Sequence, residues 1–188
     1  MTTLINADTV VGGAVITADA SGELGLQSAG TTALTLTGGN TTVAQKLTAI
    51  GTSSTAGMKI ADVLETATIS ATAATGTINY DVTTQAVLYY TSNASANWTV
   101  NFRGSSGTSL NTLMATGESV TVAFLVTQGA TAYYNNVVQV DGSSVTPKYQ
   151  GGTAWSSGNA SSIDVYSYTI IKTGSAAFTV LASQTKFA

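Results

Sequence analysis

Apolar and polar residues alternate along most of the chain after residue 66. Residues 78–82 and 98–102 each place an apolar side chain at every second position. Similar runs cover residues 120–126, 137–140, 163–171 and 178–182. A period of two is typical of strands that are half buried, with one face on a core and one face in solvent. The pattern therefore predicts about seven to nine short β-strands in this part of the chain.

Turn-forming residues separate these runs. Asp141-Gly142, between two apolar stretches, is the sharpest hairpin signal in the sequence. Residues 110–114 are spaced as one short helical turn at the edge of a sheet. Strands of this length and spacing are typical of β-sandwiches. We predict an all-β chain in which residues 66–188 form an antiparallel, jelly-roll-like sandwich.

The first part of the chain has a different pattern. Leu24 and Leu26 are followed by a polar turn ending in Thr-Thr, and Leu34 and Leu36 begin a second copy of that unit. Such a unit is too short to bury its own leucines, so its core would come from neighbouring units or chains. We interpret residues 1–50 as a β-repeat segment for attachment and oligomerisation, with these four leucines as candidate interface residues. The alternatives are chance matching in low-complexity sequence and an ordinary meander.

Residues 51–65 join the two regions. Residues 51–56 resemble a linker, and the apolar residues Met58, Ile60, Val63 and Leu64 have a spacing compatible with a short helix. We therefore expect a linker or a short helix between the repeat segment and the sandwich.

The composition removes most catalytic chemistry. The chain has no cysteine and no histidine, and only 8% of its residues are charged. Nucleophile and base pairs of the Ser-His or Cys-His type are therefore unavailable, and a zinc site would have to be built from carboxylates alone. No run of residues resembles a dedicated calcium loop or a phosphate-binding loop. We expect no enzyme activity, no cofactor and no metal site.

Charge and hydropathy limit the partners. The net charge is −3 and the basic residues are widely spaced, which disfavours nucleic acid. No apolar stretch is long enough to span a bilayer, and the first residues lack the blocks of a signal peptide. We expect synthesis in a cytoplasm, although the composition is that of an outward-facing extracellular β protein. A virion component, assembled in a host cell and released by lysis, satisfies both expectations.

Aromatic residues supply the one plausible recognition chemistry. Tyr133, Tyr134, Tyr149 and Trp155 fall where loops are expected, and flat rings of this kind stack on the C–H faces of sugars. These four are our candidate ligand or receptor contacts. The alternative is that the tyrosines alternate into the core and that Trp155 packs under a long loop or in a subunit contact.

Several segments resemble a known group of proteins. Residues 66–82 (TATISATAATGTINYDV), 86–94, 137–152 and 181–188 are similar to a domain of virion proteins from marine phages, especially cyanophages. Residues 4–9 and 22–30 resemble the repetitive starts of phage fibre proteins. The resemblance implies a structural or tail-fibre-like virion protein, a homotrimer, and it carries no established binding residues.

Together these observations give an expected function. We expect a surface-exposed trimeric fibre or capsid decoration protein, attached to other virion proteins by its N-terminal part and located on the virion. The alternative is an adhesin domain that binds a host receptor or surface glycan through the C-terminal loops. A free-standing bacterial surface domain is a third hypothesis, disfavoured because no export signal is present.

Overall fold

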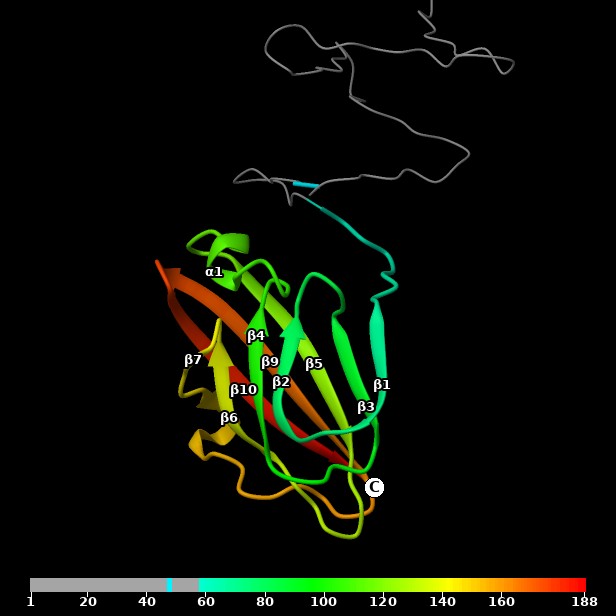
Figure 1. The fold of residues 1–188 in the computed structure, drawn as a ribbon. Coiled ribbons are helices and arrows are strands. Elements are labelled where there is room, and N and C mark those ends of the chain that lie inside the picture. The colour runs from blue at the N-terminus through cyan, green and yellow to red at the C-terminus, as the bar shows by residue number, and fades with distance from the viewer. Residues whose placement is uncertain (1–46, 49–57) are drawn as a thin grey trace, which may run out of the picture. The chain divides into compact units, whose positions relative to one another are not determined.

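The described part of the chain folds into two β-sheets that pack face to face, as seen in the computed structural model (Figure 1). The structure describes residues 47–48 and 58–188. Contacts divide the chain into Met1–Lys59 and Ile60–Ala188, and the second unit holds both sheets. The predicted repeat segment, with Leu24, Leu26, Leu34 and Leu36, lies outside the described residues.

The larger sheet has six strands in the order β1-β3-β5-β9-β10-β8. Their bounds are β1 Ala67–Ala73, β3 Val87–Ser92, β5 Ser119–Thr127, β8 Lys148–Tyr149, β9 Ile163–Gly174 and β10 Ala177–Phe187. The smaller sheet has four strands in the order β2-β4-β6-β7. Its bounds are β2 Gly76–Asp81, β4 Trp98–Arg103, β6 Asn135–Val140 and β7 Ser143–Ser144. A short helix, α1 (Leu110–Leu113), and a 3-10 turn, η1 (Gln150–Gly152), complete the described part.

The sheets are mixed, so the prediction of an antiparallel sandwich was wrong. From β1 to β6 the chain crosses to the opposite sheet after every strand, and it returns to each sheet in the same direction. We call this path of β1 to β6 the winding. Neighbours β1-β3-β5 and β2-β4-β6 are therefore parallel. Antiparallel pairing enters with β9, which pairs with both β5 and β10, and with β7. The predicted β-rich class is confirmed, and a jelly roll is not.

The connections between strands explain why the sheets are mixed and not antiparallel. The connections that contain residues 93–95, 103–107 and 128–130 join strands in opposite sheets, whereas a hairpin joins neighbouring strands in one sheet. Asp141-Gly142 is a true hairpin: Val140 pairs with Ser143, and the two turn residues have φ of 50° and 80°. Positive φ at both central positions is the type I′ geometry that Asp-Gly favours. The sharpest turn prediction is therefore confirmed.

Like residues pair in register between β2 and β4 of the small sheet. Thr77 to Asp81 on β2 pair one by one with Thr99 to Arg103 on β4, so that Thr lies beside Thr, Asn79 beside Asn101 and Tyr80 beside Phe102. Asn101 Nδ2 donates to Asn79 Oδ1 at 2.8 Å, and the Tyr80 and Phe102 ring centroids are 5.5 Å apart. Such in-register pairs stabilise neighbouring strands through their side chains. The side chains of β2 and β4 therefore stabilise the pairing of these two strands of the winding.

The core lies between the two sheets and is rich in aromatic rings. Its largest fully buried side chains include Trp98, Tyr80, Tyr166, Tyr168, Phe102 and Phe124. The Trp98 ring contacts Phe124 and Tyr166 edge to face, with centroids 5.9 and 5.6 Å away. Buried rings contribute large apolar areas, and edge-to-face contacts add to that contribution. The alternating residues predicted on β2 and β4 are confirmed as the small sheet's share of this core.

Helix α1 confirms the helical turn predicted over residues 110–114, and it is held at both ends by distant side chains. The Asp141 carboxylate accepts hydrogen bonds from the backbone N–H groups of Leu110 (2.6 Å) and Asn111 (2.9 Å). At the other end the Lys172 ammonium donates to the carbonyls of Asn111 and Met114. The first N–H groups and last carbonyls of a helix lack intrahelical partners, so these contacts satisfy them.

Residues 58–66 form no helix, contrary to the short-helix alternative for this stretch. The apolar side chains there are exposed, Leu64 at 99%. Short helices are held mainly by packing of an apolar face, and this stretch has no such packing among the described residues.

We predict that Asp141→Ala lowers the free energy of unfolding by about 2 kcal/mol, because two charge-assisted bonds to α1 are lost. Asp141→Asn is the matched control, since Asn also tolerates positive φ and keeps one acceptor oxygen. Urea denaturation of both variants measures the difference. Equal unfolding midpoints for Asp141→Ala and wild type would contradict the assigned role.

Candidate functional site

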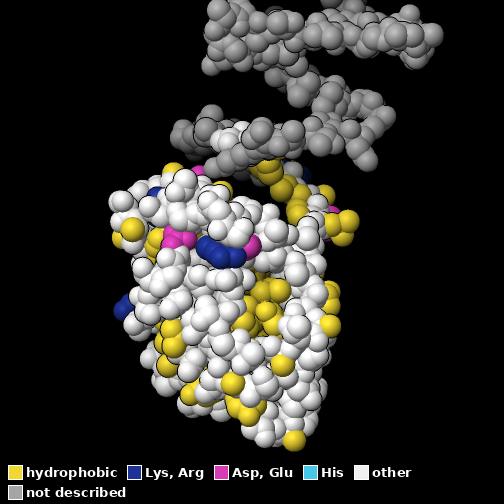
Figure 2. Space-filling model, viewed as in Figure 1, with side chains coloured by type: hydrophobic (Ala, Val, Ile, Leu, Met, Phe, Trp, Pro, Cys, Tyr) yellow, Lys and Arg dark blue, Asp and Glu magenta, His cyan; other side chains and the backbone are white. Residues whose placement is uncertain are grey.

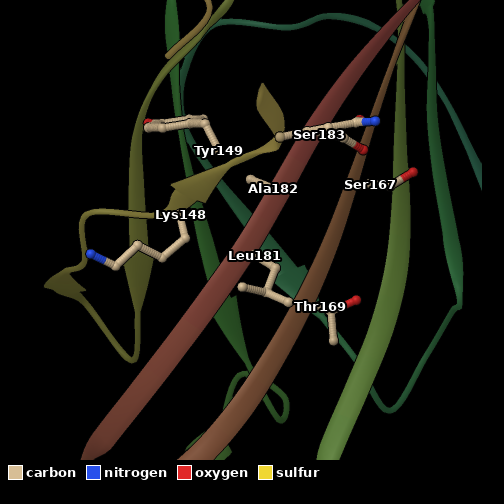
Figure 3. A pocket seen from close by; sticks show the side chains of 8 residues that line it. Lys148, Tyr149, Ser167, Thr169, Leu181, Ala182 and Ser183 are labelled. Carbon is tan, nitrogen blue, oxygen red and sulfur yellow. The ribbon is translucent and has the colours of Figure 1, made fainter. Parts of the chain in front are cut away.

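An open groove lies where β8 pairs with β10 at one edge of the large sheet (Figure 3). It consists of two adjoining hollows of about 380 and 520 Å³ that share Tyr149, Gln150, Ala182 and Ser183. The first is also lined by Ser167 and Thr169 of β9, by Leu181 and by Lys148. The second is also lined by Thr153, Trp155, Gln184, Thr185 and Lys186. The groove therefore combines hydroxyl, amide and amine groups with two aromatic rings.

Two of the four aromatic residues predicted from the sequence meet at this groove. The Tyr149 and Trp155 ring centroids are 4.8 Å apart and edge to face. Trp155 also contacts the buried rings of Tyr166 and Tyr168, and its Nε1 donates to the Asn135 carbonyl at 2.5 Å. Trp155 is thus a wall of the groove and also a structural contact with the core. Tyr149 is half buried, and burial raises the pKa of its hydroxyl.

The other two predicted residues lie in the connection between β5 and β6. Tyr133 and Tyr134 are half buried and pack against the core, and neither lines the groove. The Tyr133 carbonyl accepts a hydrogen bond from Gln128 Nε2, and the Tyr134 N–H donates to Asn97 Oδ1. The structure therefore brings together Tyr149 and Trp155, and it does not add Tyr133 and Tyr134 to them.

The groove residues that sequence reasoning missed come from β10 and from Gln150. Gln184 Nε2 donates to the Ser157 carbonyl and to the Tyr166 hydroxyl, so its amide is held in place. Gln150 is exposed and lines both hollows. Polar residues near the end of a strand carry no distinctive sequence signal. Only the pairing of β8 with β10 shows that these residues lie beside Tyr149.

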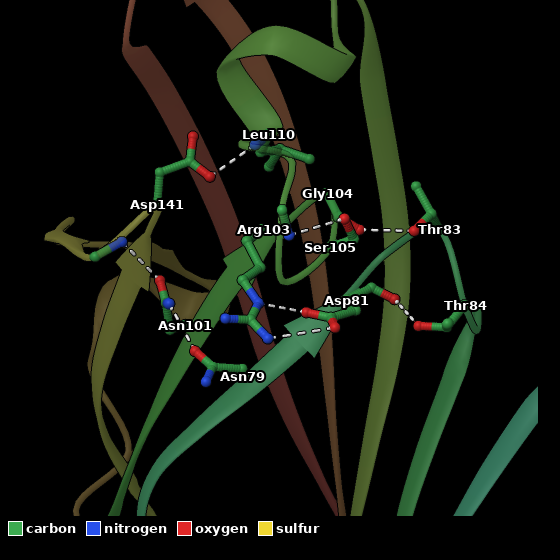
Figure 4. A network of polar contacts seen from close by, with 12 residues as sticks. Asn79, Asp81, Thr83, Thr84, Asn101, Arg103, Gly104, Ser105, Leu110 and Asp141 are labelled. Carbon is green, nitrogen blue, oxygen red and sulfur yellow. Dashed lines mark hydrogen bonds and ion pairs between the residues drawn. The ribbon is translucent and has the colours of Figure 1, made fainter.

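A second polar cluster lies at the end of the small sheet (Figure 4). Arg103 Nε is 2.5 Å from Asp81 Oδ1 and Nη2 is 3.4 Å from Oδ2, while Asn101 Oδ1 accepts from the Gly142 N–H. Figure 2 shows cationic and acidic side chains gathered near one end of this face. Both carboxylates of this cluster have partners: Asp81 forms an ion pair with Arg103, and Asp141 accepts hydrogen bonds from the backbone of α1. We interpret the cluster as structural.

A buried carboxylate, Asp164, lies at the start of β9. Its Oδ2 accepts from Gln128 Nε2 and from the Asn159 N–H, both at 3.0 Å, whereas its buried Oδ1 has no hydrogen-bond partner among the described residues. A Cβ at Gly158 would collide with the Tyr133 carbonyl and with Asp164 Oδ2, so this packing requires glycine. Burial raises the pKa of Asp164, and its two donors and Lys186 only partly oppose that effect.

The described residues contain no group of three or more His, Cys, Asp or Glu side chains that could hold a metal ion. None of the helices in residues 47–48 and 58–188 has the length and apolar character needed to cross a membrane.

No protein-family model matches the sequence, and no curated protein or solved structure has significant similarity to it.

We predict a pH-dependent contribution of Asp164 to stability. Its pKa in the folded state lies above the ordinary value of 3.8, so the folded chain binds the proton more tightly than the unfolded chain does. The contribution is therefore present below the unfolded pKa and is lost as pH rises through the folded pKa. Asp164→Asn keeps an acceptor for Gln128 and Asn159 and removes the titration.

Urea denaturation of wild type and Asp164→Asn between about pH 3 and about pH 8 tests this prediction. We expect the stability of wild type relative to the variant to fall as pH rises. A difference that stays constant over this range would show that the carboxyl titrates alike in both states.

Proposed function

We propose that this chain is a structural protein of a bacteriophage virion, a surface-exposed fibre or decoration subunit that assembles as a homotrimer. Its N-terminal part would attach to other virion proteins, and its two-sheet domain would face outward. The protein would be assembled in the host cytoplasm and become extracellular after lysis. It would act by assembly and would have no catalytic role.

The observation that carries this proposal is the stacked winding of β1 to β6. Successive turns place strands side by side in register, with like side chains paired between β2 and β4, as with Asn79 and Asn101, and build the domain from a Thr-, Ser- and Asn-rich sequence. Stacked repeats of this kind extend in one direction and leave long faces for contact. The resemblance of residues 66–82 to phage virion proteins supports the same role, because this segment forms β1 and β2, the first strands of the winding.

The test is a measurement on particles. We expect mass spectrometry of purified virions to detect the chain, and the full chain to rebind to particles that lack it. A chain without residues 1–59 is expected to lose subunit association or occupancy on the particle. Absence from virions would overturn the proposal, and unaltered mass and occupancy after truncation would overturn the role of the N-terminal part.

A second candidate function is binding of a host-surface saccharide, and the groove favours it. Aromatic walls with amide and hydroxyl groups beside them suit the apolar faces and hydroxyls of sugars. Tyr149 and Trp155 supply the rings, and Gln150, Ser183 and Gln184 supply polar groups. This function is compatible with a virion fibre, since such a protein meets the host surface first.

We predict that Gln150→Ala weakens binding to lipopolysaccharide of the host by about tenfold, or about 1.4 kcal/mol, through loss of a hydrogen-bonding amide. The side chain is exposed, so the fold should be unaffected. Gln139→Ala, outside the groove on β6, is the matched control. Trp155→Ala is unsuitable because that ring packs on the core. Equal binding by both variants and wild type, measured by surface plasmon resonance, would argue against the groove.

A further inference from the structure

The outer face of the six-stranded sheet has no charged residue on its five long strands, and Lys148 of the two-residue edge strand β8 lies on this face beside Leu181. On β3, β5, β9 and β10 the inward positions carry buried core residues, and on β1 they carry Thr68 and Ser70. The outward positions of these five strands are odd-numbered residues within 67–69, 87–91, 119–127, 163–173 and 179–187. All of these are Ala, Val, Ile, Leu, Phe, Tyr, Ser or Thr. The outward face of the small sheet differs, since Asp81 and Arg103 lie on it.

An apolar row crosses this outer face in register. Ile69 pairs with Tyr89, Tyr89 with Leu125, and Leu125 with Val165, on four successive strands. Ile69 is 61% exposed, and the other three are half buried. The solvent side of a sheet normally carries polar residues, so a continuous apolar row there indicates an interaction surface.

We propose that this outer face packs against the same face of a second copy of the chain. The inference goes beyond the proposed function, because identical faces that pack on each other join two copies by a twofold contact, which is a different contact from the one that would form the homotrimer. It adds an interface to the two-sheet domain itself, apart from the predicted N-terminal repeat.

The absence of charge favours a second copy as the occupant. When identical faces meet, every charge would approach its own kind or be buried without a partner, and both arrangements are costly. A face of apolar, Ser and Thr residues avoids this cost. It also offers no charge pattern by which a dissimilar partner would be selected.

The size of the face fits the same occupant. The five long strands, spaced about 4.8 Å apart and with about nine residues each at about 3.3 Å, cover about 19 by 30 Å, or about 600 Å² in projection. A side-chain surface exceeds its projected area, and stable interfaces bury about 800 Å² on each partner. Two such faces can pack as stacked sheets do, about 10 Å apart.

The test compares full-length wild type with Ile69→Lys and Thr77→Lys by light scattering. Lysine at either position is solvated in a single chain, since Ile69 and Thr77 are both exposed. Thr77 is the matched control because it faces outward from the other sheet. We expect wild type and Thr77→Lys to be oligomers of the same mass, and Ile69→Lys to have about half that mass, because loss of a twofold contact separates the two copies that it joins.

A second measurement uses the absence of cysteine. Leu125→Cys places the single thiol near the middle of the face, and a short bis-maleimide should join two chains, whereas Thr77→Cys should stay unjoined. This readout keeps the proposal testable if a lysine variant folds poorly.

Other results overturn the inference. A monomeric wild type, an unchanged mass for Ile69→Lys, or equal losses in both lysine variants would each exclude this face as the interface. Detection of the chain in virions is a separate result, so an unchanged Ile69→Lys mass would leave the proposed virion role intact and place the subunit contact elsewhere.

Discussion

The structure depends on a shared core that neither sheet can form alone. Strands β2 to β6 each have an apolar face, and crossing to the opposite sheet after every strand turns that face toward the same interior. Trp98 shows the result, because this residue of the small sheet contacts Phe124 and Tyr166 of the large sheet. Register follows from this arrangement, since a shift of one residue would turn every ring outward.

The remaining polar contacts close the ends of this core. Asp141 of the β6–β7 turn and Lys172 of β9 form hydrogen bonds to the two ends of α1. Gln128 and Asn159 donate hydrogen bonds to Asp164 near the start of β9. Asp141, Lys172 and Gln128 lie 30 or more residues from the groups that they hold, Asn159 lies five residues from Asp164, and all are buried or half buried. Unpaired polar groups in such positions are costly, so the contacts restrict how the loops between the layers can run. The hairpin of β9 and β10 then completes the large sheet and forms one side of the groove.

Two surfaces follow from the same architecture and suit different tasks. The outer face of the large sheet has no charged residue on its five long strands and suits contact with another chain, whereas the groove beside β8 combines aromatic rings with amide groups. They lie on the same sheet, with the apolar row on β1, β3, β5 and β9 and the groove on β9, β10 and β8. Ser167, Thr169, Leu181 and Ser183 belong to both surfaces, so a contact over the whole face would cover the hollow that they line, whereas Trp155 lines the other hollow.

The sequence by itself determined the β-rich class, the strands after residue 66, the Asp141-Gly142 hairpin and the helical turn at Leu110, because these depend on local alternation and local turn chemistry. Only the tertiary structure decided that the sheets are mixed, because turns of similar composition can join two strands of one sheet or two strands of opposite sheets. It also separated Tyr149 and Trp155, which meet at a groove, from Tyr133 and Tyr134, which pack elsewhere. The pairing of β8 with β10 joins residues more than 30 positions apart, and no local pattern encodes that distance.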